Sequence, residues 1–309
     1  MRRQGGEAVS TTIPEVPAQR KRAATQPLRI SAYATRRWLI RAAVFLLLMT
    51  IAFSTIYPVL FTVNAALKTQ KGWAENRFAI SIPPSLDMFR DAWRRSNVLR
   101  SFMNSLITTS GGVVGAWIVC SMAAFAATKL RFRGRDAIFV MLLASMMIPM
   151  QTILYPFYVQ VRDLKMINQY HGLILTFTAF AIPMTTYLLA AYFKGIPDDL
   201  LDAARIDGAS SWQTLVHVIV PIARPALAAI GIINFVWMWN DLLMPLMVMQ
   251  RPDRTTLIVS LSMLRGQYGA STTLVCAGVI IAVTPVVLMY LVAQEQLVKG
   301  MTMGAVKGG

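Results

Sequence analysis

Six apolar runs, each about as long as a bilayer is thick when wound into a helix, constrain the fold of this chain most. A transmembrane helix needs about 20 mainly apolar residues. The charged fraction, 14%, is far below the quarter or so that keeps a soluble domain in water. We therefore expect an all-α integral membrane protein with six transmembrane helices, over residues 38–63, 103–127, 137–161, 172–193, 226–249 and 274–297.

The distribution of basic residues predicts how these spans are oriented. Lys129, Arg131, Arg133 and Arg135 lie within one short connector, and such clusters mark the cytoplasmic side of a span. With six spans, both termini and the connector 194–225 are then cytoplasmic too. The chain divides into a basic, mostly disordered cytoplasmic arm (1–37), a transmembrane domain (38–298) and a cytoplasmic tail (299–309).

The first outer connector, 64–102, departs from this charge bias, because it carries several cations as well. Within it, Leu86, Phe89 and Trp93 recur at helical spacing among charged residues. This pattern predicts a short amphipathic helix that lies at the outer membrane interface.

The net charge of +16 does not indicate nucleic-acid binding, since the cations lie in the arm and the connectors and no recognition module is present. No Gly-x-x-x-x-Gly-Lys-Ser/Thr run exists to hold a triphosphate, so no ATP site is expected here. Cys120 and Cys276 lie in apolar runs and His171 and His217 lie far apart, so neither pair predicts a metal site. We expect no catalytic residue, bound cofactor or metal.

Prolines are expected to interrupt four of the spans: Pro149 and Pro156 the third, Pro183 the fourth, Pro245 the fifth and Pro285 the sixth. A proline frees a backbone carbonyl, which membranes tolerate where neighbouring helices or a water-lined cavity satisfy it. Breaks of this kind suit a bundle that encloses a path. Gly111, Gly112 and Gly115 would let the second span approach another helix closely.

The connector 194–225 holds the most informative stretch. Pro197 suits a first helical turn, and Asp198, Asp199 and Asp202 would lie near its positive end. Gly208 can adopt the left-handed conformation that ends a helix. Ser210 or Ser211 can cap a second short helix that bears Trp212. The sequence predicts a helix–turn–helix elbow, or else an ordinary amphipathic connector resting on the membrane.

This stretch resembles the EAA loop of the permease subunits of bacterial ABC importers, through Asp202-Ala203-Ala204, Gly208 and Ile219-Val220-Pro221. The family has Glu where Asp202 stands, so the carboxylate is retained on a side chain one methylene shorter. In that family the loop docks in a cleft of the cytoplasmic ATPase. The resemblance implies that the coupling residues are Asp199, Asp202, Ala203, Ala204, Asp207, Gly208 and Trp212.

Two further matches resemble the carbohydrate-importing, maltose-type branch of the family. They are Trp239-Asn240-Asp241 in the fifth span and the tail 300–308, Gly-Met-Thr-Met-Gly-Ala-Val-Lys-Gly. The resemblance covers about residues 55–308. It implies a carbohydrate substrate.

A candidate substrate path follows from helical spacing. Asn234, Trp237, Met238 and Asp241 share one face of the fifth span, and an intramembrane acid is a functional candidate by default. Stacking on an aromatic ring and hydrogen bonds to hydroxyls are the chemistry that sugars require. Asp241 could instead pair within the bundle or lie at the outer interface. Further candidates are Asn240 and, in the third span, Gln151, Tyr155 and Tyr158, which could instead pack against a partner.

The resemblance implies a six-helix permease in the bacterial cytoplasmic membrane. It would act with a second, related permease, two cytoplasmic ATP-binding subunits that supply ATP and Mg²⁺, and an extracytoplasmic solute-binding protein. The alternatives are a secondary transporter driven by an ion gradient and a membrane-embedded enzyme. The first would require several buried charges and an internal repeat, and the second would require a catalytic constellation. The sequence has neither.

Overall fold

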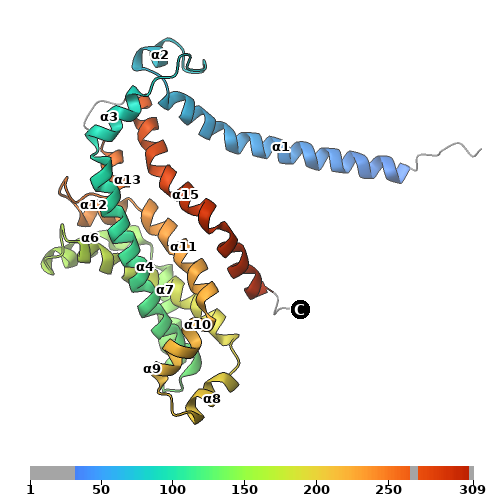
Figure 1. The fold of residues 1–309 in the computed structure, drawn as a ribbon, viewed down its shortest axis with the longest axis vertical. Helices are drawn as coiled ribbons and strands as arrows, with labels where there is room; N and C mark the ends of the chain where they lie inside the picture. The colour runs from blue at the N-terminus through green and yellow to red at the C-terminus, as the bar shows by residue number, and fades with distance from the viewer. Residues whose placement is uncertain (1–31, 265–270, 306–309) are drawn as a thin grey trace, which may run out of the picture. The chain divides into compact units, whose positions relative to one another are not determined.

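The computed structural model describes residues 32–264 and 271–305, and of residues 32–35, 293 and 295–305 only the backbone. Every regular element in these ranges is a helix (Figure 1). The helices are α1 (Ala32–Ala66), α2 (Gln70–Glu75), α3 (Asp87–Arg95), α4 (Val98–Lys129), α5 (Arg135–Ala144), η1 (Ser145–Met147), α6 (Met150–Asp163), α7 (Tyr170–Lys194), α8 (Asp199–Ile206), α9 (Ser211–Thr214), η2 (Leu215–Ile219), α10 (Val220–Ile222), α11 (Arg224–Asn240), α12 (Leu243–Val248), α13 (Leu257–Ser262) and α15 (Thr272–Ala305). The all-α class predicted from the sequence is confirmed.

Four of the predicted spans are single helices. They are Arg36–Ala66, Val98–Lys129, Tyr170–Lys194 and Thr272–Val292, each long and apolar enough to cross a bilayer. Two bent helix pairs raise the number of candidate spans among the described residues to six if each pair is one span. Residues up to Ile56 and residues from Tyr57 onward are separate compact units. The sections below concern the second unit.

The third predicted span, 137–161, is not one helix. Residues 135–147 and 150–163 are bent by 103° at Ile148 and Pro149. A residue before proline is pushed out of the helical region, and Ile148 is accordingly extended, with ψ of 115°. Pro149 then caps α6, whereas Pro156 lies inside it without ending it.

The fifth predicted span, 226–249, is interrupted, as Pro245 led us to expect, but the break lies upstream of that proline. α11 ends at Asn240, and a new short helix, α12, starts at Leu243. Pro245 has no N–H to bond the carbonyl of residue 241, so a continuous helix would lose a bond there. The Asp241 carboxylate instead accepts the backbone N–H groups of Leu243 and Met244, at 3.3 and 3.2 Å. The break therefore precedes Pro245.

Pro183 and Pro285 do not break their helices as expected: α7 and α15 continue through them. α15 also runs on to Ala305, through much of the segment assigned to a tail. Residues 306–309, and the arm up to residue 31, lie outside the described residues.

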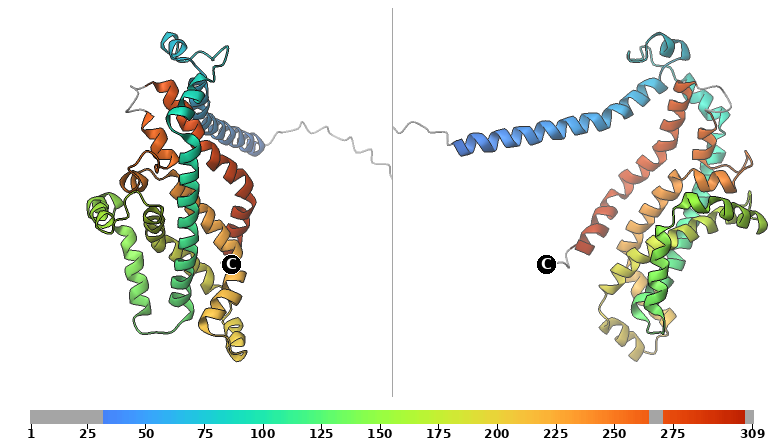
Figure 2. Two further views of the ribbon diagram at one scale, coloured as in Figure 1. Left: turned by 60° about the vertical axis from the view of Figure 1, so that its left-hand side comes forward. Right: turned by 180° about the vertical axis from the view of Figure 1, so that it is seen from behind.

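The core of the bundle is the pair α4 and α7, which pack against each other more extensively than any other pair of described helices and lie side by side in both views of Figure 2. Glycines allow this approach, as the sequence predicts. A Cβ on Gly115 would lie 2.3 Å from Thr178 Oγ1, and one on Gly112 would lie 2.9 Å from Phe177 Cβ. α11 packs against α4, α7 and α15.

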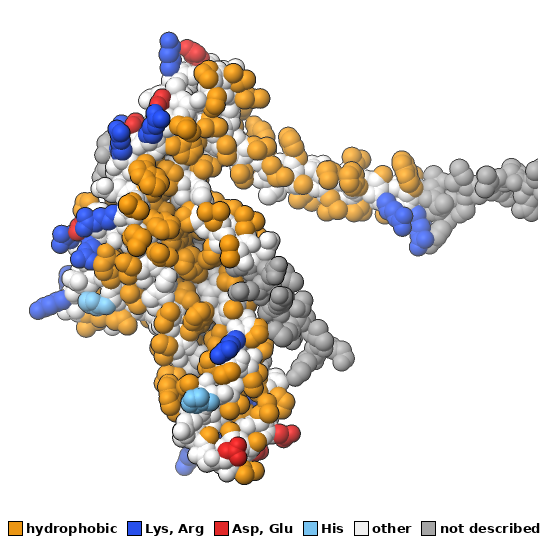
Figure 3. Space-filling model, viewed as in Figure 1, with side chains coloured by type: hydrophobic (Ala, Val, Ile, Leu, Met, Phe, Trp, Pro, Cys, Tyr) orange, Lys and Arg blue, Asp and Glu red, His pale blue; other side chains and the backbone are white. Residues whose placement is uncertain are grey.

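Figure 3 shows a face largely covered by hydrophobic side chains, with basic and acidic side chains at its top, along its left-hand edge and at its foot. Leu99, Leu106, Val114 and Ile118 of α4 are exposed. A surface with this many exposed apolar side chains fits a protein whose solvent is lipid.

The short amphipathic helix predicted from Leu86, Phe89 and Trp93 is α3, which packs against α15 and α4. Ala92 is its buried residue, whereas Arg94 and Arg95 lie in its last turn. α3 therefore covers one end of the bundle.

Candidate functional site

The elbow, defined as residues 198–218, is a helix–turn–helix as predicted. α8 ends in two backbone bonds: Gly208 N donates to Arg205 O at 3.0 Å, and Ala209 N to Ala204 O at 2.9 Å. This pair is the Schellman motif, which needs a left-handed residue after the helix. Gly208 supplies it, with φ of 79°.

The second half of the elbow starts with a reciprocal cap. Gln213 N donates to Ser210 Oγ at 3.3 Å, while Ser210 N donates to Gln213 Oε1 at 2.8 Å. This capping box satisfies two N–H groups at the start of α9. The helix then widens into the π-helical turn η2, and residues 211–222 and 224–240 are bent by 79°. The elbow is thus a defined turn rather than an irregular connector.

The outer surface of the elbow holds the residues expected to couple. Asp199, Asp202, Ala203, Asp207, Gly208 and Trp212 are exposed, and Ala204 is half-buried. Leu200 and Ile206, which the sequence did not single out, are exposed as well, Ile206 to 86%. The sequence signal that could have identified them was their apolar character on a short helix that also carries two acids, Asp199 and Asp202. Apolar side chains exposed on a charged projection suit a docking surface.

Asp202 is paired inside the elbow. Arg205 Nη1 donates to Asp202 Oδ1 at 2.8 Å, and both side chains are more than half exposed. A pair this exposed contributes little to stability, so the carboxylate remains available to another partner.

The base of the elbow is held by a buried cation. Lys129 Nζ donates to Asp198 Oδ1 at 2.6 Å and to Ile196 O at 2.7 Å. The Lys129 side chain is 5% exposed. The hydrogen bond and the charge of Lys129 lower the pKa of the Asp198 carboxyl below its usual 3.8. The sequence indicated Lys129 only as a topology marker, because the fold alone brings residues 129 and 198 together.

A polar cavity of about 680 Å³ lies beside this contact, between the elbow and the connector after α4. Its lining includes Arg131, Leu201 and Arg205 along with Lys129 and Asp198. Leu201 is the buried residue of α8 and anchors it on the bundle.

The residues proposed for a substrate path are only partly brought together. Asn234 is buried and its Nδ2 donates to Thr185 Oγ1 at 2.9 Å. Trp237, one turn later, is 40% exposed and lies edge-on to Phe177 with ring centroids 6.3 Å apart. Asn240 is exposed and donates to Val236 O. Asp241 is no longer on their helical face, since it follows the end of α11.

The candidates in the third span lie on α6. Gln151 is exposed and Tyr155 is 77% exposed, while Tyr158 is half-buried. α6 packs against α12, the helix that follows Asp241. α6, which carries Tyr155, is therefore a neighbour of the helix that follows Asp241.

Trp239, part of the motif that resembles carbohydrate importers, is a packing residue in this chain. It is 2% exposed and stacks on Phe235 with ring centroids 5.5 Å apart. Its ring also meets the edge of Phe102. It fixes the end of α11 against α4.

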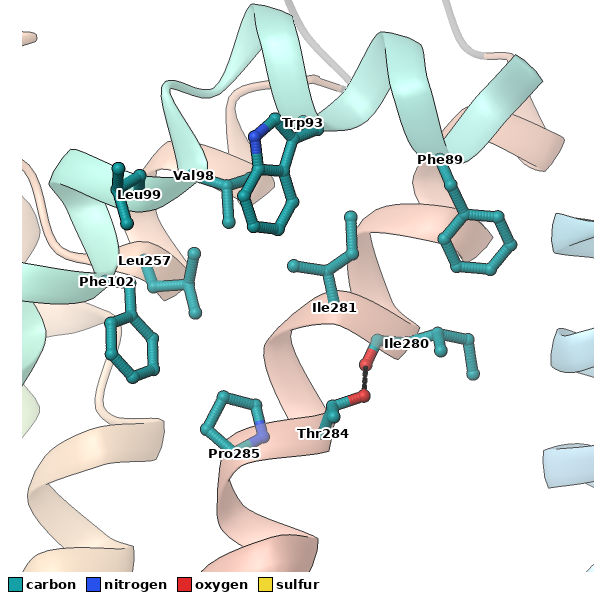
Figure 4. A pocket seen from close by; sticks show the side chains of 10 residues that line it. All are labelled: Phe89, Trp93, Val98, Leu99, Phe102, Leu257, Ile280, Ile281, Thr284 and Pro285. Atoms are coloured by element: carbon teal, nitrogen blue, oxygen red, sulfur yellow. Dashed lines mark hydrogen bonds between the residues drawn. The ribbon is translucent and has the colours of Figure 1, made fainter. Parts of the chain in front are cut away.

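An apolar cavity of about 500 Å³ lies beneath α3 (Figure 4). Trp93, Phe102, Leu257 and Ile281 point into it. Thr284 Oγ1 already donates to Ile280 O at 2.7 Å. Sugar hydroxyls need hydrogen-bond partners, and this lining offers almost none. The cavity is therefore unsuited to a carbohydrate.

The connector between α12 and α13 is fastened to the bundle. Asn104 Nδ2 donates to Thr255 O at 2.9 Å, and Tyr170 Oη donates to Asn104 Oδ1 at 2.7 Å. The Arg254 guanidinium lies 4.5 Å from the centre of the Tyr170 ring. These contacts hold the end opposite the elbow in one arrangement.

Several known proteins are similar to this chain in sequence. A family model described as "Binding-protein-dependent transport system inner membrane component" matches residues 118–302. The trehalose transport system permease SugB of Mycobacterium tuberculosis (strain CDC 1551 / Oshkosh) is 32% identical, over 82% of this chain and 93% of SugB. The diacetylchitobiose uptake system permease NgcG of Streptomyces coelicolor is 28% identical, over 89% of this chain and 91% of NgcG.

A solved structure agrees in fold. A chain from the crystal structure of a bacterial ABC transporter involved in the import of the acidic polysaccharide alginate has a TM-score of 0.70 to this chain. The two are 24% identical, and the match covers 86% of this chain and 98% of that one. None of these similarities favours a transporter driven by an ion gradient. The chain belongs to the family of binding-protein-dependent transport system inner membrane components, the permease subunits of ABC importers.

Proposed function

We propose that this permease forms, with a second related permease, the path by which a carbohydrate crosses the bacterial cytoplasmic membrane, and that the elbow couples it to cytoplasmic ATPase subunits. The observation that carries the proposal is the exposed surface of the elbow. The elbow exposes three acids, Asp199, Asp202 and Asp207, together with Ile206 and Trp212, on a turn that its own backbone bonds define.

A docking role fits the chemistry of that surface. Trp212 is 58% exposed and Ile206 86% exposed, and burying such side chains against a partner would contribute about 1.5–3 kcal/mol each. The Asp202 carboxylate can accept from a partner cation, while Ala203 leaves space for close approach. A second protein, rather than lipid, suits acids that are interleaved with apolar groups.

Coupling would then be a shift between two packed states of the permease pair. Closure of the ATPase subunits would move the elbow, and the bundle would open toward the solute-binding protein on the outside. The permease itself would bind no nucleotide; ATP and Mg²⁺ would be held by the ATPase subunits. Both termini would be cytoplasmic.

A carbohydrate substrate is supported by the relatives, whose names refer to trehalose and diacetylchitobiose. In this chain Trp237 offers a half-exposed aromatic ring, and Asn240 offers an exposed amide. Tyr155 and Gln151 on α6 add a phenol and a second amide. Rings and amides are the groups that bind sugar faces and hydroxyls.

The test uses two glycines with the same backbone strain. Gly208 and Gly134 both have positive φ, 79° and 85°, and a Cβ at either would meet nothing within 4 Å. Gly208→Val and Gly134→Val thus cost a similar left-handed penalty, about 1–2 kcal/mol. Both are assayed for solute-dependent ATP hydrolysis and sugar uptake in proteoliposomes that contain the whole complex.

If the elbow couples, Gly208→Val abolishes uptake while the permease remains inserted, and Gly134→Val retains most of it. Equal uptake by both variants, with the ATPase subunits still bound, would refute coupling through the elbow.

A further inference from the structure

We propose that Lys129 is a positioning residue that fastens the elbow to α4, so that motion of the elbow is delivered to the centre of the bundle. The proposal rests on the coupling role of the elbow proposed above. It assigns to the connector after α4 a function beyond marking the cytoplasmic side.

The geometry joins two segments far apart in sequence. Lys129 is the last residue of α4, and the two acceptors of its ammonium, Ile196 O and Asp198 Oδ1, flank Pro197 at the entrance to the elbow. Asp198 is the residue that precedes α8. One cation therefore fixes the point at which the chain leaves α7 and starts α8.

Burial distinguishes this cation from its neighbours. The Lys129 side chain is 5% exposed, whereas Arg131 and Arg133 in the same connector are exposed. Burying an ammonium is costly unless it donates hydrogen bonds. Here it donates one bond to the Asp198 carboxylate, at 2.6 Å, and one to the Ile196 carbonyl, at 2.7 Å. A topology marker needs only a charge near the membrane; it does not need this burial.

The elbow has few other attachments at this point. α8 rests on the bundle through buried Leu201, and its ion pair between Arg205 and Asp202 stays within the helix. In the described part of the chain, Lys129 makes the side-chain hydrogen bonds and ion pair that join residues 196–206 to another helix. Without them α8 would be held mainly by apolar contact, which is not directional.

The receiving element is suited to transmit motion. α4 and α7 are packed tightly through Gly112 and Gly115, where even a Cβ would collide with α7. Packed helices of this kind move together rather than deform. Displacement of the elbow would therefore reach α4 through Lys129 and move α7 with it.

Two variants test the contact from both sides. Lys129→Met keeps the apolar stem and removes the ammonium. Asp198→Ala removes the acceptor at an exposed position, where the side chain makes no cap bond to α8. Asp198→Glu retains the carboxylate and serves as the rescue. Arg133→Met in the connector after α4 and Asp136→Ala in the first turn of α5 change exposed charges nearby and serve as matched controls.

The full complex in proteoliposomes gives two readouts: sugar transported per ATP hydrolysed, and hydrogen exchange of the backbone amides of residues 199–207. We expect Lys129→Met and Asp198→Ala to lower the transport ratio about 5-fold or more, the size of a typical coupling free energy, and to speed exchange in α8. Asp198→Glu and both controls should stay near wild type in both readouts.

Should Lys129→Met fail to insert, Asp198→Ala decides alone, because Asp198 is exposed. A wild-type transport ratio in Asp198→Ala would overturn the proposal. In that case Gly208→Val shows which proposal has failed. If Gly208→Val is inactive in the same membranes, only the role of Lys129 is refuted and the coupling role of the elbow stands. If Gly208→Val is also active, both proposals fail.

Discussion

Gly231 in α11 lies directly against the indole ring of Trp117 in α4: a Cβ on Gly231 would be 2.4 Å from Trp117 Cζ2. The same indole donates from Nε1 to Leu227 O, one turn earlier in α11, at 3.0 Å. The ring therefore fills the space that a side chain at 231 would occupy and hydrogen-bonds to the neighbouring turn. This contact sets the spacing between the second span and the fifth.

Gly231→Ala should destabilise the permease by about 1–3 kcal/mol, because Trp117 cannot move without losing its bond to Leu227. Alanine's better helix propensity offsets up to about 1 kcal/mol of this. Gly278→Ala in α15 is the control, since its Cβ would meet only the side-chain ends of Leu264 and Leu261 at 3.3 and 3.4 Å. Thermal unfolding in detergent measures both. If Gly231→Ala and Gly278→Ala unfolded at the same midpoint temperature, Trp117 would be able to shift at little cost.

Thr185→Val should cost about 1–3 kcal/mol, because it leaves the buried Asn234 amide without its partner. Asn234→Leu should cost a similar amount, and the double variant less than the sum of the two. Thr176→Val is the control: Thr176 is also buried in α7 but donates only to Gly172 O of its own helix. Denaturant unfolding of the wild type, both single variants and the double variant measures the interaction free energy between Thr185 and Asn234. Strictly additive costs would mean that Asn234 is satisfied elsewhere, as a residue facing a wet path would be.

Asp241→Asn should leave stability within about 0.5 kcal/mol, because the amide oxygen can still accept one of the two N–H groups and Asn caps a helix about as well as Asp. Asp241→Ala removes that acceptor and should cost about 1 kcal/mol. Sugar uptake then separates the two roles of the residue. If Asp241→Asn has normal stability but no sugar uptake, the negative charge is needed for transport. If its uptake is normal, the role of Asp241 is to cap the start of α12.

The contact between Lys129 and Asp198 should be insensitive to pH in the physiological range. The Asp198 pKa is lowered from 3.8 by Lys129, so the contact stabilises the folded state fully above about pH 5 and is lost as pH falls through the lower, folded value. The difference in unfolding midpoint between wild type and Asp198→Ala should be constant from about pH 5 to 8 and shrink below about pH 4. A difference that disappeared between pH 6 and 7 would point to another titrating group.

Local chemistry was sufficient for the elbow. Gly208 and Ser210 act through the backbone of residues a few positions away, so the sequence predicted the turn and offered Ser210 or Ser211 as the cap; the reciprocal bond to Gln213 came from the structure. The amphipathic spacing of Phe89 and Trp93 predicted α3 for the same reason. Apolar length likewise predicted α1, α4, α7 and α15 as spans.

What the sequence determined by itself was thus the class of protein, the apolar length of its spans and the turn of the elbow, since each depends on residues within a few helical turns; it did not predict that α7 and α15 continue through Pro183 and Pro285. The breaks near Pro149 and Pro245 have local causes, whereas only the tertiary structure decided the pairing of Lys129 with Asp198. The tertiary structure also decided which glycines pack directly against another helix. Those features depend on contacts between distant segments, 69 residues apart for Lys129 and Asp198, and a contact between distant segments exists only once the helices have packed.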